Sequence, residues 1–111
     1  MSSALFSPIA LRDLQLRNRI MLSPMCQYAA VDGCAGDWHL MHLGQYMVSG
    51  LGLVMLEMTN VQANGRITPN CLGLYNDACE TALQRVVDYC RGLSDTPMAV
   101  QLAHAGRKAS S

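Results

Sequence analysis

Apolar positions in this chain follow two spacings, one typical of strands and one typical of helices. Alternating apolar and polar residues over 11–16 predict a small hairpin. Short apolar runs at 20–22, 53–56 and 97–102 predict three strands, the last entered through a proline. The run at 53–56 does not alternate, a pattern typical of a parallel strand covered on both faces.

Two stretches between these runs have the helical spacing. The first helix is predicted over 38–49, with Asp37 as its N-cap. The second is predicted to begin at a capping box of Asp77 and Glu80 and to end at Gly92. Each has an apolar stripe at spacings of three and four. The stripes are Leu40, Leu43, Met47 and Leu51 in the first, and Leu83, Val86, Val87 and Cys90 in the second.

The predicted order is a hairpin followed by strand, helix, strand, helix and strand. This order requires parallel strands with right-handed crossovers, and folds of this α/β class bind ligands at the carboxyl ends of their strands. Polar or chemically unusual groups follow all three strands, at 23–28, 57–60 and 101–107. We therefore expect a ligand site there. Taken alone, the 23–28 stretch also fits an ordinary strand end in which Met25 and Cys26 pack in the core.

Composition narrows the class of protein. Half of the 111 residues are hydrophobic and the formal net charge is zero, so nothing favours nucleic acid or an anionic membrane surface as a partner. The longest apolar run is too short to cross a bilayer, and the N-terminus has no signal-peptide pattern. Five scattered cysteines without a Cys-x-x-Cys pair indicate reduced thiols in a cytoplasmic protein.

Three segments give the chain a family resemblance. They are 17–28 with its Ser-Pro-Met-Cys-Gln-Tyr sequence, 64–68 with Asn-Gly-Arg-Ile-Thr, and 101–108 with a Gln-Leu-x-His-x-Gly-Arg motif. Together they resemble the N-terminal part of the Old Yellow Enzyme family. The branch most similar is that of the bacterial "thermophilic-like" NADPH dehydrogenases, which have cysteine at the position of Cys26.

The resemblance implies a TIM (β/α)8 barrel. Such a barrel typically needs about 250 residues. Residues 1–111 are therefore expected to be the N-terminal part of one barrel domain, an incomplete barrel with the hairpin, roughly three strands and two helices. The resemblance also implies that the intact relative is a homo-oligomer.

The resemblance further implies FMN as cofactor and NADPH or NADH as reductant. The reduced flavin would pass hydride from N5 to the activated C=C bond of an α,β-unsaturated carbonyl substrate. Cys26 would adjust the flavin's reduction potential, Tyr28 would contact substrate, and Gln101 would hydrogen-bond the flavin pyrimidine ring. Asn60 stands where this branch has alanine against the flavin. The implied cofactor-binding residues are Ser23, Pro24, Met25, Cys26, Asn60 and Gln101.

Other polar residues have simpler explanations. His39 and His42 could share a metal with Cys34, but no fourth ligand is evident, and we predict no metal site. Glu57 is expected to pair with a cation, and Arg66 to hold the long connection after the second strand.

His104 and Arg107 could serve a ligand or pin their loop. Two rival functions also remain: a non-catalytic βαβαβ binding module or part-barrel, and a nucleotide-binding half-domain. The latter is disfavoured because no Gly-x-Gly-x-x-Gly turn follows the first strand.

Overall fold

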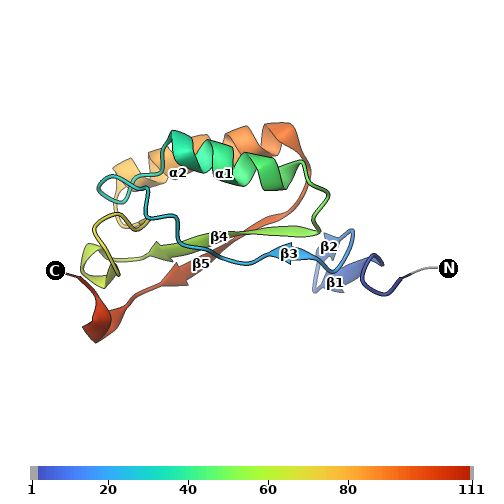
Figure 1. Ribbon diagram of the computed structural model, residues 1–111, viewed down its shortest axis with the longest axis horizontal. Helices are drawn as coiled ribbons and strands as arrows, with labels where there is room; N and C mark the ends of the chain where they lie inside the picture. The colour runs from blue at the N-terminus through green and yellow to red at the C-terminus, as the bar shows by residue number, and fades with distance from the viewer. Residues whose placement is uncertain (1–2, 111) are drawn as a thin grey trace.

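A three-stranded parallel sheet with two helices on one face makes up most of the protein. The computed structural model describes residues 3–110. Figure 1 shows the hairpin at one end of the molecule and both helices running above the sheet. In chain order the elements are β1 (Ile9–Leu11), β2 (Leu14–Leu16), β3 (Met21–Leu22), α1 (Asp37–Met47), β4 (Leu53–Asn60), the 3-10 turn η1 (Ala63–Gly65), α2 (Asp77–Leu93), β5 (Met98–Ala103) and the 3-10 turn η2 (Gly106–Lys108).

The predicted hairpin and βαβαβ order are confirmed. β1 and β2 pair antiparallel, and the sheet order β3-β4-β5 places β4 in the centre with parallel neighbours on both sides. The central strand is longer than the apolar run that predicted it, because its polar end Glu57–Asn60 also pairs with β5. The register shifts between Leu56 and Met58, so Glu57 is the extra residue of a β-bulge.

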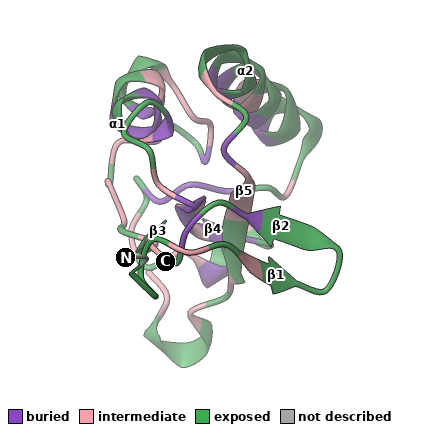
Figure 2. Cartoon of the chain, turned by 90° about the vertical axis from the view of Figure 1, so that its right-hand side faces the viewer, coloured by how far each residue is buried: buried purple, intermediate pink, exposed green. Residues whose placement is uncertain are grey.

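The core lies between the sheet and the two helices. Val54 and Leu56 of β4 are almost fully buried there against Met47 of α1 and Val86 of α2. The buried band under both helices is visible end-on in Figure 2. The stripe residues Leu43, Leu83 and Cys90 also belong to this cluster. The helical spacing in the sequence thus identified the faces that pack on the sheet.

β5 is the edge of the sheet in the described residues, since β4 is its sole partner there. Leu102 is 60% exposed and Val100 is 37% exposed, although both come from an apolar strand. Met21 on β3 is likewise 45% exposed. Exposed apolar side chains on an edge strand are typical of a surface that packs against further structure.

Both helix starts differ from the sequence-based predictions by one residue. The N-cap of α1 is Gly36, and His39 replaces a side-chain cap by accepting the Gly36 backbone N–H at Nδ1, 3.0 Å away. The N-cap of α2 is Asn76, whose Oδ1 accepts the Cys79 N–H at 2.8 Å. α2 also continues through Gly92 to Leu93, because this glycine keeps helical geometry and Ser94 caps the end.

Candidate functional site

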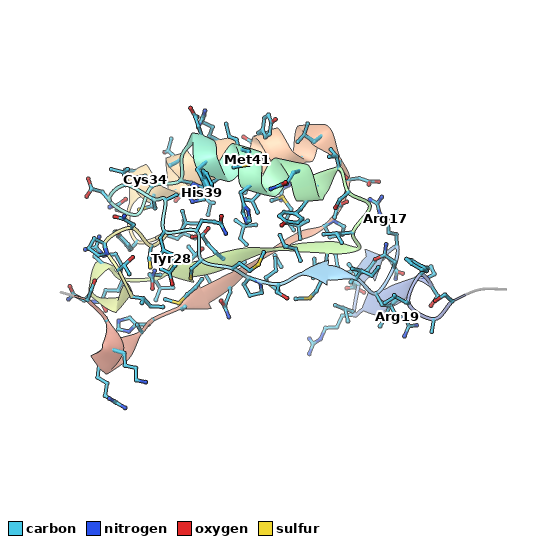
Figure 3. The ribbon with its side chains drawn as sticks, viewed as in Figure 1. Arg17, Arg19, Tyr28, Cys34, His39 and Met41 are labelled. Carbon is cyan, nitrogen blue, oxygen red and sulfur yellow. The ribbon has the colours of Figure 1, made fainter. Side chains whose placement is uncertain are left out.

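The carboxyl ends of the three parallel strands bring together the three polar segments predicted to form a site. β3 leads into 23–28, β4 ends at Asn60, and β5 runs past Gln101. In Figure 1 β4 and β5 run away from the hairpin, and the segments that follow them lie at the opposite end of the molecule. Figure 3 places Tyr28 and His39 in this region, one below and one within α1.

The loop after β3 holds its residues in an unusual conformation. Tyr28 has a φ of 53°, a left-handed conformation that is uncommon for a bulky residue and is often found at functional sites. Its side chain is exposed, whereas Cys26 is half-buried. The neighbouring Cys26 thiol is the main reason that the Tyr28 pKa is raised. The two groups predicted to act together are therefore adjacent.

Cys26 is held as a neutral thiol. Burial is the largest cause raising its pKa, followed by Cys71 and the Glu57 carboxyl. A neutral thiol is a polarisable group and a weak hydrogen-bond donor rather than a nucleophile. This environment suits a residue that contacts a cofactor better than one that forms a covalent intermediate.

Glu57, the bulge residue of β4, lies buried beneath the first turn of α1. Its Oε2 is 3.7 Å from His39 Nε2, and the two side chains are only 4% and 2% exposed. Because His39 Nδ1 accepts the Gly36 N–H, the ring proton of neutral His39 resides on Nε2 and faces the carboxyl. His39 Nε2 has no hydrogen-bond partner within 3–110.

Burial shifts both groups toward their neutral forms. It raises the Glu57 pKa to about 7, partly offset by the Gln27 backbone N–H. It also lowers the His39 pKa, an effect to which His42 adds. Glu57 therefore faces an imidazole that burial shifts toward its neutral form, and its predicted pairing with a cation stays a prediction.

Gln27 connects this buried pair to the loop. Its backbone N–H donates to Glu57 Oε1 at 3.4 Å. Its side-chain Nε2 donates to Met25 O at 2.9 Å, and its Oε1 accepts from Trp38 Nε1 at 2.9 Å. Glu57 and Trp38 together fix the backbone on either side of Cys26 against β4 and α1. No role for Gln27 beyond its place in the motif was predictable from the sequence, because Glu57 and Trp38 come from other segments.

Gln101 and Met58 face the same side of the sheet, since they are register partners on β5 and β4. Gln101 is exposed, and no hydrogen bond to its carboxamide occurs in the described part of the chain. Ser23 and Met25 are exposed and Pro24 is half-buried. These five residues leave donors, acceptors and apolar atoms accessible at the strand ends.

Asn60 differs from them in being fully buried. Its Nδ2 donates to Leu72 O at 2.9 Å, and its Oδ1 has no partner among residues 3–110. Its backbone also pairs with Gly73, so the side chain braces the β4 end against the following connection. Its contact with a cofactor stays a prediction.

The loops after β4 and β5 hold each other in place. His104 Nε2 lies 2.9 Å from Gln62 Oε1, its Nδ1 accepts the Gly106 N–H at 3.0 Å, and its ring packs on Gly65. Arg66 donates to Ala63 O at 3.1 Å, which confirms that it holds the long connection. Arg107 is exposed.

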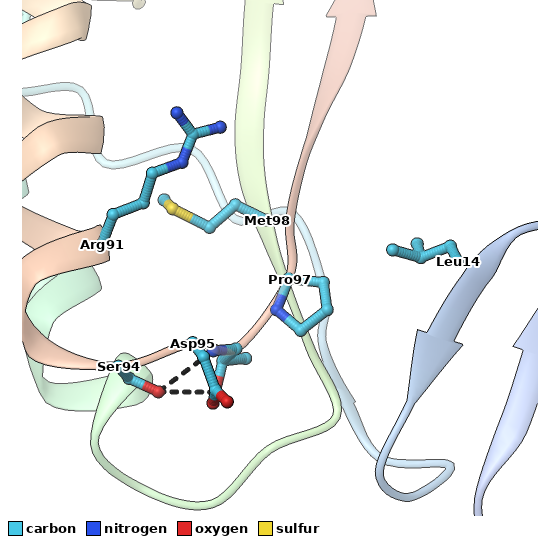
Figure 4. Close-up of a pocket in the computed structure, with 7 residues that line it drawn as sticks. Leu14, Arg91, Ser94, Asp95, Pro97 and Met98 are labelled. Carbon is cyan, nitrogen blue, oxygen red and sulfur yellow. Dashed lines mark hydrogen bonds between the residues drawn. The ribbon is translucent and has the colours of Figure 1, made fainter.

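Hollows elsewhere lie away from these groups. The cavity in Figure 4, about 420 Å³, is bordered by Arg91, Asp95 and Pro97 at the opposite, amino ends of the strands. Ser94 and Thr96 close a local turn there, with their hydroxyl oxygens 2.9 Å apart. Among residues 3–110, no three His, Cys, Asp or Glu side chains group as metal ligands, and no helix is long and apolar enough to cross a membrane.

Comparison with known families assigns the chain. The model of the NADH:flavin oxidoreductase / NADH oxidase family matches residues 4–111. The chain belongs to this family, whose cofactor is FMN used with NADH or NADPH.

Relatives match almost the whole chain but extend well beyond it. An NADH:flavin oxidoreductase of Gibberella zeae is 47% identical over 109 residues, covering 98% of this chain and 26% of the relative. NADPH dehydrogenases of Bacillus cytotoxicus and Listeria monocytogenes are 45% and 49% identical, each over 32% of its own length. The chain spans between a quarter and a third of these relatives.

Solved structures give the same result for the fold. Morphinone reductase superposes with a TM-score of 0.86 at 29% identity, covering 96% of this chain and 28% of that protein. The Old Yellow Enzyme of Pichia sp. AKU4542 superposes with a TM-score of 0.85 at 23% identity, again over 28% of its length. Morphinone reductase has also been solved with tetrahydroNAD. The expected resemblance to Old Yellow Enzymes is confirmed, and the neighbours are TIM-barrel proteins.

Proposed function

We propose that residues 1–111 form the N-terminal part of the (β/α)8 barrel of an FMN-dependent NAD(P)H oxidoreductase, an ene-reductase acting on α,β-unsaturated carbonyl compounds. The observation that supports this most strongly is the placement of Cys26 and Tyr28 after β3 and of Gln101 near the carboxyl end of β5, the two strands that flank β4 in the parallel sheet of a chain of this family. That is where barrel enzymes build their active sites.

The accessible groups fit a flavin. Gln101 offers an unpaired carboxamide, which can both donate to and accept from the alternating edge of a pyrimidine ring. Pro24 and Met25 offer apolar atoms in the segment after β3, and Ser23 an exposed hydroxyl. Asn60 has its carboxamide committed to Leu72 O, so a contact from this position would rely on the backbone or on the unpaired Oδ1.

The contacts of this chain support a role for each residue. FMN, when bound, would supply hydride chemistry, receiving hydride from the nicotinamide and delivering it from N5 to the β-carbon of the substrate. Cys26 would present a neutral thiol to the flavin edge and tune its potential. Tyr28 would direct its exposed phenol toward the substrate. Glu57 and His39 would hold the Cys26 backbone through the Gln27 N–H.

The wider setting is also a proposal. We place 1–111 in one barrel domain of a cytoplasmic, homo-oligomeric enzyme that takes NADPH or NADH and a small unsaturated carbonyl compound as partners. A second candidate is a part-barrel without turnover of its own. The exposed apolar edge strand β5 and the coverage of only 26–32% of the curated relatives favour it for the 111 residues in isolation.

A chimera tests the cofactor assignment. Residues 1–111 would replace the matching segment of the Bacillus cytotoxicus NADPH dehydrogenase, which is 45% identical over this stretch. We expect a protein that retains FMN through gel filtration. Gln101→Ala should weaken FMN binding about tenfold, as expected for the loss of one hydrogen bond.

Cys26→Ala is the companion variant. It should leave FMN content unchanged and shift the flavin reduction potential, because the thiol lies at the cofactor's edge rather than serving as its anchor. Gln15→Ala, which removes an exposed carboxamide from the hairpin, is the control and should change neither quantity. A folded chimera without FMN, or a Gln101→Ala variant that binds FMN as tightly as the parent, would refute the assignment.

A further inference from the structure

We propose that Cys34 and Cys79 are an oxidation site, a pair of thiols that an oxidant such as hydrogen peroxide converts to a disulfide joining the β3–α1 loop to α2. The proposal does not depend on flavin binding. It rests on the contacts of a tight turn, Val31 to Cys34, with the first turn of α2.

The turn brings both sulfur atoms to one acceptor. Val31 and Cys34 pair as an isolated antiparallel β-bridge. The two residues between them, Asp32 and Gly33, have positive φ angles of 52° and 78°. This geometry leaves the Asp32 carbonyl accessible to the Cys34 thiol at 3.9 Å. The Cys79 thiol reaches the same oxygen from α2, at 3.7 Å. Both sulfur atoms thus lie beside one oxygen, and the Cys34 thiol also interacts directly with the Cys79 thiol, although the two residues are far apart in sequence.

The turn is packed tightly against α2. A Cβ placed on Gly33 would lie only 3.0 Å from Cys79 Sγ. The backbone supports the same approach, because Gly33 O accepts the Gly73 N–H at 2.9 Å and Asn76 Oδ1 caps the helix at Cys79 N. Forming an S–S bond of about 2.05 Å would therefore require movement of the short turn from Val31 to Cys34, and not of the sheet or the helices.

Exposure gives the two sulfurs different roles. Cys79 is fully buried, whereas Cys34 is partly exposed at the end of the molecule seen in Figure 3. Cys34 is therefore the thiol that an oxidant meets first, and Cys79 is placed to resolve the product. Burial and the adjacent Cys79 raise the Cys34 pKa, so the reaction should accelerate as the pH rises above neutral.

The chemistry balances with peroxide as oxidant. The Cys34 thiolate attacks one peroxide oxygen, the O–O bond breaks, and a sulfenic acid and water form. The Cys79 sulfur then attacks the Cys34 sulfur, the S–O bond breaks, and a second water leaves with the remaining thiol proton. The net change is two thiols and one peroxide to one disulfide and two waters.

Other thiols in the chain are less well placed. Cys90 is fully buried in the core cluster. Cys71 is 1% exposed, and its sulfur accepts the Thr68 N–H at 3.3 Å. Its influence on the Cys26 pKa makes Cys26–Cys71 the competing pair. Cys34–Cys79 is favoured because both thiols share one acceptor and one of them is accessible.

A disulfide between Cys34 and Cys79 would affect the loops that border the candidate site. The turn belongs to the loop that carries the chain from Tyr28 to α1, and α2 follows the connection that braces Asn60. Oxidation would fasten these two loops together. Because the bond constrains the unfolded chain, it should raise the melting temperature, by about 10 °C, and dithiothreitol should reverse the rise.

Peptide mapping of the 111-residue protein tests the proposal. The protein would be treated with hydrogen peroxide at pH 8, alkylated and digested without reduction, and its cross-linked peptides identified by mass spectrometry. We expect Cys34–Cys79 as the main disulfide. Cys34→Ser should abolish it and leave Cys79 alkylatable after unfolding, while the control Cys90→Ser should retain it.

Two results would overturn the proposal. One is Cys26–Cys71 as the main disulfide in the unmodified sequence. The other is Cys34 oxidised to sulfenic or sulfinic acid with Cys79 still reduced. Both are read from the parent protein, so neither depends on whether a variant folds.

Discussion

Glu57 shows how much of the site depends on one buried side chain. Its carboxyl accepts the Gln27 N–H and faces His39 without a charged partner. The sequence suggested the end of a strand, but Glu57 lies inside β4, which continues to Asn60, and its neighbour was not predictable. The imidazole comes from the first turn of a helix, and a β-bulge with no local sequence signal turns Glu57 toward it.

The pH dependence of stability tests this environment. Folding raises the Glu57 pKa from 4.5 to about 7, so the folded protein binds this proton more tightly than the unfolded chain does. The free energy of unfolding should therefore fall as the pH rises from about 4.5 through 7, by about 3 kcal/mol in total. The lowered His39 pKa acts in the opposite sense, because its contribution is lost as the pH falls below the ordinary value of 6.5.

Urea unfolding at pH 5.0 and 8.0, which span most of this range, would measure the Glu57 effect. Glu57→Gln should remove most of the loss seen in the parent protein, since the amide keeps an acceptor for the Gln27 N–H but does not titrate. Glu80→Gln, on the exposed first turn of α2, is the matched control and should keep the parental slope. An unchanged slope in Glu57→Gln would show that this carboxyl is not responsible.

At the scale of elements, the spacing of apolar residues predicted which segments are helices and which are strands. The residues at the N-caps determine where the helices begin. The apolar stripes of α1 and α2 are buried where expected, from Leu43 to Cys90. The helix starts were missed because Gly36 has no capping side chain and Asn76 outcompetes the neighbouring Asp77. Neither choice is visible in the hydrophobic pattern.

Two glycines in similar sequence contexts should respond oppositely to alanine. Gly52 immediately precedes β4 and lies against the segment before β3, so a Cβ there would clash with Asn18 O. Asn18 cannot easily move, because its Nδ2 donates to Gly50 O and its Oδ1 accepts the Ile20 N–H. Gly52→Ala should therefore cost about 2–3 kcal/mol of stability.

Gly92 is the control for this substitution. It lies in the last turn of α2 with open space around its missing Cβ. Gly92→Ala should stabilise the protein by about 0.5–1 kcal/mol through helix propensity. Thermal or urea unfolding of both variants provides the comparison. Equal effects would mean that the close approach of Asn18 to Gly52 does not govern this junction.

At the scale of the whole molecule, one face of the sheet is covered, and both edge strands, β3 and β5, pair only with β4 among the described residues. The helices bury Val54 and Leu56, while Leu102 on β5 stays 60% exposed. The family resemblance, and not the hydrophobic pattern, indicated a barrel, because three strands and two helices fit several α/β folds equally well. The placement of Gln101 beside Met58 needed the bulge at Glu57, which sequence alone does not reveal.

Turnover by the chimera tests the central claim most directly. The measurement is NADPH oxidation coupled to reduction of 2-cyclohexen-1-one under anaerobic conditions, with product identified by gas chromatography. If residues 1–111 supply the flavin-facing part of an ene-reductase, the chimera should form cyclohexanone and the isolated 111-residue chain with added FMN should form almost none. A folded, FMN-loaded chimera that leaves the alkene unreduced would contradict the account.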